Sequence, residues 1–218
     1  VVFVALLIGI MFHVERYENM DFNRFQDIMD TIRYSNMSFQ EFLSDDSNLL
    51  KWLNRTLPYM YSFDLLIFLI SKCFENNYVM VWVSIIIDYA IIAYIAYDWR
   101  RDSRYRNKEV VLSILACFAL LPMIHACSGL RTATSACFMS LAIYKFLYRN
   151  KNWLIFALYC AIAITFHPAT LMAVPIAVAI KVSPRKIVFY ITLLGCLFVS
   201  QIATFLSNSG NLFLQGLG

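Results

Sequence analysis

Two residues with side chains suited to binding an anionic group and moving a proton lie on consecutive apolar stretches of the sequence. Arg131 follows the turn residues Ser128 and Gly129 and opens one apolar run, and His167 stands before Pro168 at the end of the next. A helix that begins near Arg131 presents backbone N–H groups and the positive end of its dipole, so a guanidinium there favours a phosphate or pyrophosphate. The His167 imidazole can accept a proton near neutral pH.

The same two residues also have structural interpretations, and the sequence leaves both kinds open. Arg131 could extend to the membrane surface, and His167 could be a hydrogen-bonded polar tip. Among the acids, Asp64 interrupts a short apolar stretch and Asp21 lies in a polar loop, so both are candidates for contact with a substrate. Asp88 lies near the middle of an apolar run and should face the interior of a helix bundle, where a hydrogen bond to another helix is the structural alternative.

The composition predicts that these residues belong to an all-α, polytopic membrane protein. Of the 218 residues, 61% are hydrophobic and only 15% are charged, whereas soluble domains average about 25% charged residues. The apolar residues form long runs separated by short basic connectors, as successive membrane spans do. No basic face interleaved with aromatic residues indicates nucleic-acid binding. The six cysteines lack the spacing of metal ligands, so we expect small core residues and no metal site.

We expect one membrane domain over residues 1–218, and we expect it to be a fragment of a longer chain. The opening run, residues 1–12, is too short to span a bilayer and has the character of the outer half of a helix. The acid-rich segment 13–57 should be a non-cytoplasmic loop with amphipathic helices, because apolar residues recur at spacings of three and four at Phe22, Phe25, Ile28, Met29 and Ile32. Spans are predicted at about 78–97, 110–127, 130–148, 153–166 with 168–182 as a hairpin, and 187–206.

The charges of the connectors orient these spans. Segments 99–108, 149–151 and 181–186 are basic and are therefore expected to be cytoplasmic, which places Arg131 and His167 together at the outer surface. Residues 58–72 then cannot cross the membrane and are predicted to be re-entrant or interfacial. Pro168 lacks an N–H and disfavours helical angles at His167, so the hairpin should be broken or re-entrant there. Such irregular backbone must be buried in protein or line a wet cavity.

The order of several short motifs is also informative. The turn Ser128-Gly129-Leu130-Arg131 leads into an Ala/Ser-rich span, and Phe166-His167-Pro168-Ala169-Thr170-Leu171 leads into an apolar run that reaches Pro175. Earlier, Arg16-Tyr17-Glu18 precedes Asp21-Phe22, and Asp64-Leu65-Leu66 lies in the short apolar stretch. In this order the chain resembles the EpsG family of membrane polysaccharide polymerases, which are related to the Wzy O-antigen polymerases. The chain has Thr132, Ala169 and Phe25 where Gln, Ser and Tyr are usual in that family.

The resemblance implies a metal-independent glycosyltransferase without a cofactor, working at the outer face of the bacterial cytoplasmic membrane in exopolysaccharide, capsule or O-antigen synthesis. It would transfer an oligosaccharide from polyprenyl pyrophosphate onto a second lipid-linked oligosaccharide. Its partners would be these substrates, membrane lipid, and flippase and chain-length regulator proteins, with no nucleic acid. The implied catalytic residues are Arg131, His167 and Asp21, and the implied substrate-binding residues are Arg16, Asp64 and Ser128.

Three other functions remain open from the sequence. A transporter or flippase for lipid-linked sugars could use Asp64, Asp88 and the break at His167 as a substrate path. An intramembrane serine protease could use Ser128 and His167, although Ala126 leaves its GxSG pattern incomplete. A purely structural membrane subunit would use none of these residues chemically.

Overall fold

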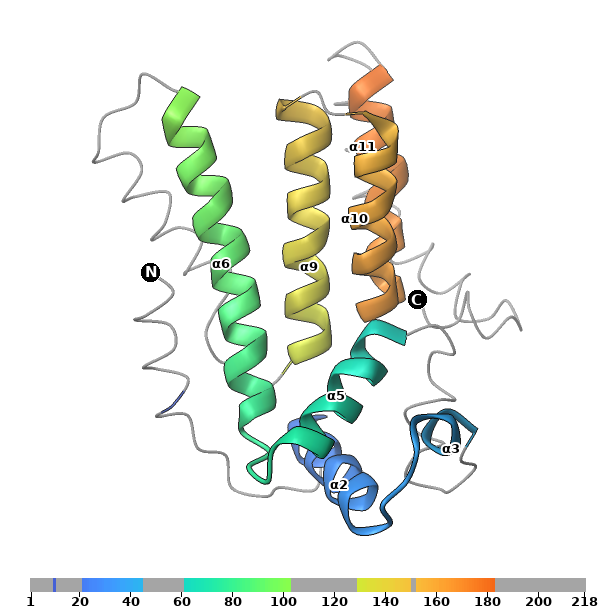
Figure 1. Ribbon diagram of the computed structural model, residues 1–218. Coiled ribbons are helices and arrows are strands. Elements are labelled where there is room, and N and C mark those ends of the chain that lie inside the picture. Colours follow the sequence, from blue (N-terminus) through green and yellow to red (C-terminus); the bar gives the residue numbers. More distant parts are fainter. Residues whose placement is uncertain (1–9, 11–20, 45–60, 103–128, 150–151, 183–218) are drawn as a thin grey trace.

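The computed structural model describes Ile10 and residues 21–44, 61–102, 129–149 and 152–182 (Figure 1). Every regular element within these residues is a helix, which confirms the all-α prediction for this part of the chain. The predicted spans 110–127 and 187–206 lie outside the described residues. So does the opening run, residues 1–12, apart from Ile10.

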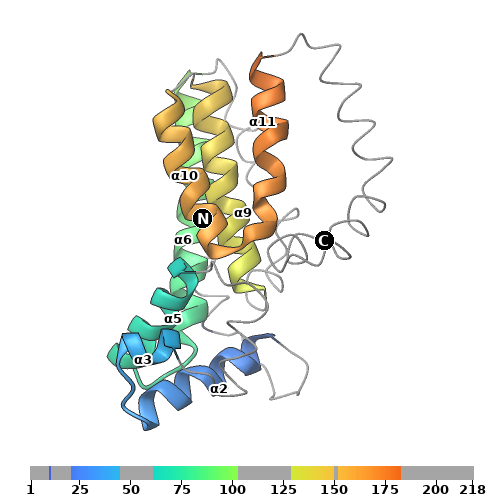
Figure 2. The ribbon, with the colours of Figure 1, turned by 90° about the vertical axis from the view of Figure 1, so that its right-hand side faces the viewer.

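Four helices stand side by side, and three others lie beneath one end of them (Figures 1 and 2). The upright helices are α6 (Val79–Asp102), α9 (Leu130–Ile143), α10 (Trp153–Phe166) and α11 (Ala173–Val182). A π-helix, η1 (Tyr144–Tyr148), continues α9, and a 3-10 helix, η2 (Pro168–Met172), joins α10 to α11. The helices beneath them are α2 (Asp21–Tyr34), α3 (Phe39–Ser44) and α5 (Tyr61–Cys73).

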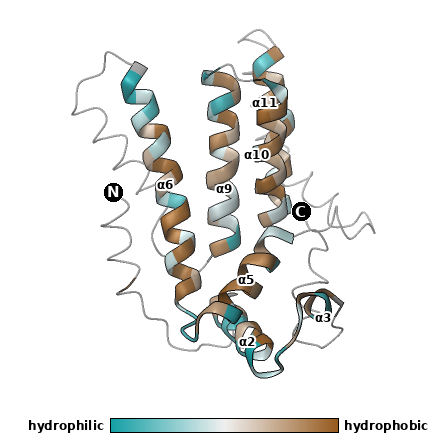
Figure 3. Ribbon diagram, viewed as in Figure 1, coloured by the Kyte–Doolittle hydropathy of each residue, from teal (hydrophilic) through white to brown (hydrophobic). Residues whose placement is uncertain are grey.

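The upright helices are largely hydrophobic, and the ends of α6 and α11 that carry their last residues are hydrophilic (Figure 3). By length and composition, one helix of the described part of the chain is suited to cross a membrane, Val79–Arg101 in α6. The apolar segments Trp153–Phe166 and Pro168–Val182 are shorter. The number of crossings, and the side of the membrane on which each connector lies, therefore stay predictions.

Helix α6 runs further than the sequence pattern indicated. The span was predicted to end at Tyr97, with a basic connector from residue 99, but the helix continues to Asp102. Two effects favour this extension. Arg100 and Arg101 are cations in the last turn, where the helix dipole is negative, and Arg101 lies 3.8 Å from the Asp98 carboxylate three residues earlier.

Helix α2 is held to the bundle by an apolar face. The five residues whose spacing predicted an amphipathic helix are all fully buried: Phe22, Phe25, Ile28, Met29 and Ile32. They join a core that also contains Phe63 and Ile67 of α5, the first turns of α6, and two residues from the upright helices, Leu130 and Phe166. This core therefore fixes the start of α9 and the end of α10 against α5 and α2.

A polar cluster adds a second link between α2 and the turn from α5 to α6. The Arg33 guanidinium donates to the Phe74 carbonyl at 2.8 Å and to Asn77 Oδ1 at 2.9 Å. Arg33 also pairs with Asp30 Oδ1 at 2.9 Å, and Asn77 Nδ2 donates to the same oxygen at 2.9 Å. Each group thus holds another in place at the far end of α2.

Candidate active site

The start of α9 and the end of α10 lie at the same end of the bundle, beside α5 (Figure 1). Arg131 is in the first turn of α9, and His167 directly follows α10. Their preceding neighbours, Leu130 and Phe166, are both buried in the core shared with α2 and α5. The chain path therefore brings the backbone at both candidate residues to one region, next to α2 and α5.

Arg131 sits over an aromatic ring. Its guanidinium carbon lies 5.6 Å from the centroid of the Phe25 ring of α2, within the range of a cation–π interaction. Phe25 is fully buried and packs edge-on against Phe63 of α5, with ring centroids 4.9 Å apart. The N-cap residue Gly129 has no side chain to cap the first N–H groups of α9, so a positive side chain and backbone donors lie close together.

Asp64 lies in the first turn of α5, near Arg131. Its side chain is buried, and its Oδ1 atom has no hydrogen-bond partner among the described residues. Helix α5 is too short to span a bilayer. Burial raises the pKa of the Asp64 carboxyl to about 7, and the positive charge of Arg131 opposes this shift. A carboxyl that titrates near neutral pH beside a guanidinium can accept a proton or bind a hydroxyl group.

The break at His167 has the extended geometry that the following proline predicts. His167 has φ −155° and ψ 110°, and its N–H still donates to the Ala163 carbonyl at 3.0 Å. Ser135 of α9 donates its hydroxyl to the same Ala163 carbonyl at 2.6 Å. Thr170 of η2 donates to the His167 carbonyl at 2.8 Å and lies 2.9 Å from Ser135 Oγ. Hydroxyl groups from two elements therefore fix the backbone on which His167 is carried.

Ser135 lies on the same helix as Arg131 and contacts the backbone next to His167. It lies four residues after Arg131, on the same side of α9, one helical turn along. The helix face that begins with Arg131 is therefore the face that contacts the break at His167.

A model of the EpsG family matches residues 1–215. The chain belongs to the EpsG family. This confirms the resemblance seen in the sequence motifs. EpsG is a Wzy-like polymerase family, and its members are glycosyltransferase-like membrane proteins of exopolysaccharide biosynthesis. No curated protein and no solved structure matches the chain.

The structure of this EpsG family member shows a contact near the candidate site that the sequence did not single out. Ser62 Oγ of α5 and Thr165 Oγ1 of α10 lie 2.8 Å apart, which joins the turn carrying Asp64 to the residues before His167. Hydroxyl side chains within apolar stretches were the available signal, since such groups pair across helices when buried. Their partners, however, depend on how the helices are placed in space.

Of the remaining predicted site residues, only some lie within the described part of the chain. Asp21 is the first residue of α2, and its neighbour Phe22 packs against the Tyr78 ring with centroids 5.3 Å apart. Arg16 and Ser128 lie outside the described residues. Asp88 is fully buried in α6 and faces the bundle interior, as predicted, where it lies beside Thr134 of α9. This position favours its structural alternative, a contact between helices.

Proposed function

We propose that this chain polymerises lipid-linked oligosaccharides at the outer face of the bacterial cytoplasmic membrane. One oligosaccharide would be transferred from polyprenyl pyrophosphate onto the terminal sugar of a second lipid-linked chain. The observation that carries the proposal is the Arg131 guanidinium at the start of α9, over the Phe25 ring and near the buried Asp64 carboxyl.

The reaction breaks the bond between the anomeric carbon of the donor sugar and a pyrophosphate oxygen. The oxygen of an acceptor hydroxyl forms the new bond to that carbon, and the acceptor proton passes to a base on the protein. The leaving pyrophosphate gains negative charge as the bond breaks. Arg131 and the first N–H groups of α9 would stabilise this charge, with Arg16 as a second cation and without a metal ion.

We propose His167 as the base, with Asp21 or Asp64 as carboxylates that orient the acceptor sugar. His167 is carried on backbone that Ser135 and Thr170 hold in place, and only part of its surface is exposed. An imidazole carried on ordered backbone needs less ordering before it takes a hydroxyl proton. Ser128 would add a donor at the turn before Arg131.

The surroundings follow from the same proposal. The polyprenyl chains would lie in lipid beside the apolar helices, in a multi-pass arrangement with the basic connectors in the cytoplasm. A flippase would supply the lipid-linked units, and a chain-length regulator would act on the product. The same chemistry would serve exopolysaccharide, capsule or O-antigen synthesis.

A polymerisation assay with purified lipid-linked repeat units in proteoliposomes tests this proposal. Arg131→Gln should lower the rate of chain growth about 100-fold or more, because removal of one donor to a developing anion commonly costs that much. Arg131→Lys should retain part of the rate, since it keeps the charge but not the planar donor geometry. The matched control is Thr132→Ala, which alters an exposed neighbour on the same turn and should leave the rate unchanged.

Two results would count against the proposal. Chain growth at the normal rate in Arg131→Gln would remove the central role of the guanidinium. Movement of labelled lipid-linked sugar across the bilayer without any chain growth would indicate a transporter instead.

A further inference from the structure

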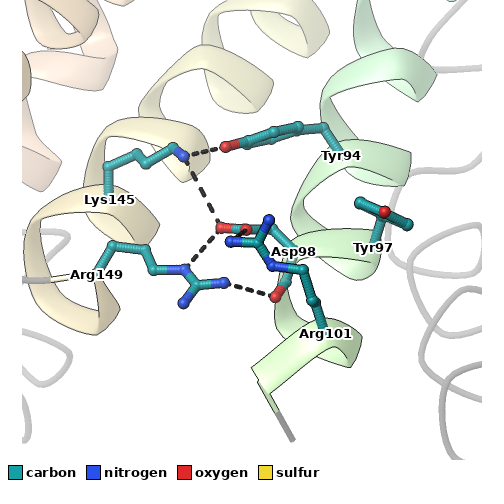
Figure 4. A pocket seen from close by; sticks show the side chains of 6 residues that line it. All are labelled: Tyr94, Tyr97, Asp98, Arg101, Lys145 and Arg149. Carbon is teal, nitrogen blue, oxygen red and sulfur yellow. Dashed lines mark hydrogen bonds and ion pairs between the residues drawn. The ribbon is translucent and has the colours of Figure 1, made fainter.

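A cavity of about 400 Å³ lies at the end of the bundle opposite Arg131, between α6 and the last turns of the α9–η1 helix (Figures 1 and 4). Its lining consists of two tyrosines, one carboxylate and three cations: Tyr94, Tyr97, Asp98, Arg101, Lys145 and Arg149. None of these residues takes part in the proposed polymerase chemistry.

The cavity has an excess of positive charge. Asp98 is buried, and Arg149 already meets its carboxylate at 2.7 Å and its backbone carbonyl at 2.6 Å. Lys145 and Arg101 each lie 3.8 Å from that carboxylate, which is beyond hydrogen-bond distance. Three cations against one carboxylate leave a net charge of +2. All three cations therefore lie within ion-pair distance of Asp98, with Arg149 the nearest, and they carry two more positive charges than this carboxylate balances.

Two of these cations, Lys145 and Arg149, are four residues apart and therefore lie on one side of the helix end, where η1 forms the last turn. Arg149 N–H donates to the Tyr144 carbonyl five residues earlier, at 3.2 Å, so this turn is wider than an α-helical turn. Lys145 and Arg149 both line the cavity from this wide turn. Single π-turns within α-helices occur frequently at functional sites.

The tyrosines suit a site at a membrane surface. Tyr97 is 66% exposed and Tyr94 is 42% exposed, and the Lys145 ammonium donates to the Tyr94 hydroxyl while lying 4.4 Å from its ring centroid. Tyrosines with one polar end are enriched at the level of the lipid headgroups. The cavity also lies at the end of α6 where the basic connector begins, which the sequence predicts to face the cytoplasm.

We propose that this cavity binds the phosphate of an anionic phospholipid from the cytoplasmic leaflet. Basic pockets between helices on that side of a membrane are suited to anionic headgroups. Lys145 and Arg101 would contact the phosphate oxygens, Arg149 would remain on Asp98, and the two tyrosines would flank the headgroup. This proposal does not depend on the polymerase reaction, because it uses other residues at the other end of the bundle.

Titration of phosphatidylglycerol into the full chain in an uncharged detergent, followed by native mass spectrometry, tests the site. Arg101→Gln and Lys145→Gln should each weaken binding about fivefold, the contribution of one cation near an anionic headgroup. The matched control is Arg100→Gln, which removes the same charge from an exposed neighbour that does not line the cavity. Phosphatidylcholine should bind much more weakly than phosphatidylglycerol.

Asp98→Asn separates this proposal from a purely structural ion-pair cluster. The substitution raises the net charge of the lining from +2 to +3, so phosphatidylglycerol should bind about fivefold more tightly. A structural cluster would lose thermal stability on this substitution and bind the lipid no better. Equal binding of the two lipids, or equal effects of Arg101→Gln and Arg100→Gln, would overturn the proposal. Displacement of the lipid by equimolar glycerol phosphate would show that the ligand is a soluble phosphate and not a lipid.

Discussion

Arg33→Ala should loosen α2 without unfolding it. Arg33 connects the far end of α2 to the turn between α5 and α6 through hydrogen bonds to the Phe74 carbonyl and Asn77 Oδ1. The substitution removes both bonds, whereas the bond from Asn77 to Asp30 remains. Because Phe25 of the same helix lies under Arg131, the loss should also reach the candidate active site.

The magnitude follows from the two forces that hold α2. Hydrogen bonds to a charged group contribute about 1.5–3 kcal/mol each. The Arg33 side chain is 22% exposed, and solvent weakens such bonds, so we assign about 2 kcal/mol to the two hydrogen bonds together. Removing five apolar side chains from water stabilises the docked position of α2 by roughly 10 kcal/mol. The apolar face therefore keeps α2 docked, and the Arg33 bonds decide how often its far end opens.

Hydrogen exchange of the full chain, read by mass spectrometry, measures this opening. A loss of about 2 kcal/mol should lower the protection of α2 amides about 30-fold, with little change in α9 or α10. Chain growth should slow, but less than in Arg131→Gln. Tyr34→Ala is the matched control, because Tyr34 is the next residue and is 85% exposed. Unchanged α2 protection in Arg33→Ala would refute the assignment of this cluster as a tether.

Two further predictions concern other parts of the fold. Ser135→Ala removes the hydroxyl that donates to the Ala163 carbonyl, at a cost of about 1 kcal/mol to the bent geometry. It should slow chain growth up to about fivefold, whereas Ser140→Ala, on an exposed position of the same helix, should not; equal rates in the two variants would contradict a positioning role. The pKa of Glu41 is lowered, first by the backbone N–H of Ser38 that donates to it at 2.7 Å. Its contribution to α3 is therefore present above the ordinary carboxyl pKa and is lost as pH falls through the lowered value. Amide protection of α3, corrected for intrinsic exchange, should decrease over that acidic range, and a Glu41→Gln variant that showed the same decrease would exclude Glu41 as the cause.

Local rules of sequence predicted the features that depend on neighbouring residues. The three- and four-residue spacing of Phe22, Phe25 and Ile28 predicted the buried face of α2, because a helix places such residues on one side. The pair His167-Pro168 predicted a break, because proline restricts the residue before it. The position of Arg131 after Gly129 predicted a cation at the start of a helix.

Local rules did not predict the features that depend on contacts between distant segments of the chain. The pairing of Asp98 with Arg149 joins α6 to the end of η1, and neither residue has a local signal that identifies the other. Phe25 was noted as part of an apolar face, but its place under Arg131 depends on how α2 packs beneath α9. The π-turn over Tyr144–Tyr148 also has no spacing pattern of its own.

The bend at His167 holds its shape without help from a ligand. The carbonyls of Ala163 and His167 receive donors from Ser135 and Thr170, which belong to the protein itself. In the proposed reaction, a substrate at His167 would meet backbone that is already ordered, so little of its affinity would be lost in ordering the chain. If the proposed polymerisation is correct, each cycle of chain growth would begin from the same backbone geometry, whatever the length of the polysaccharide.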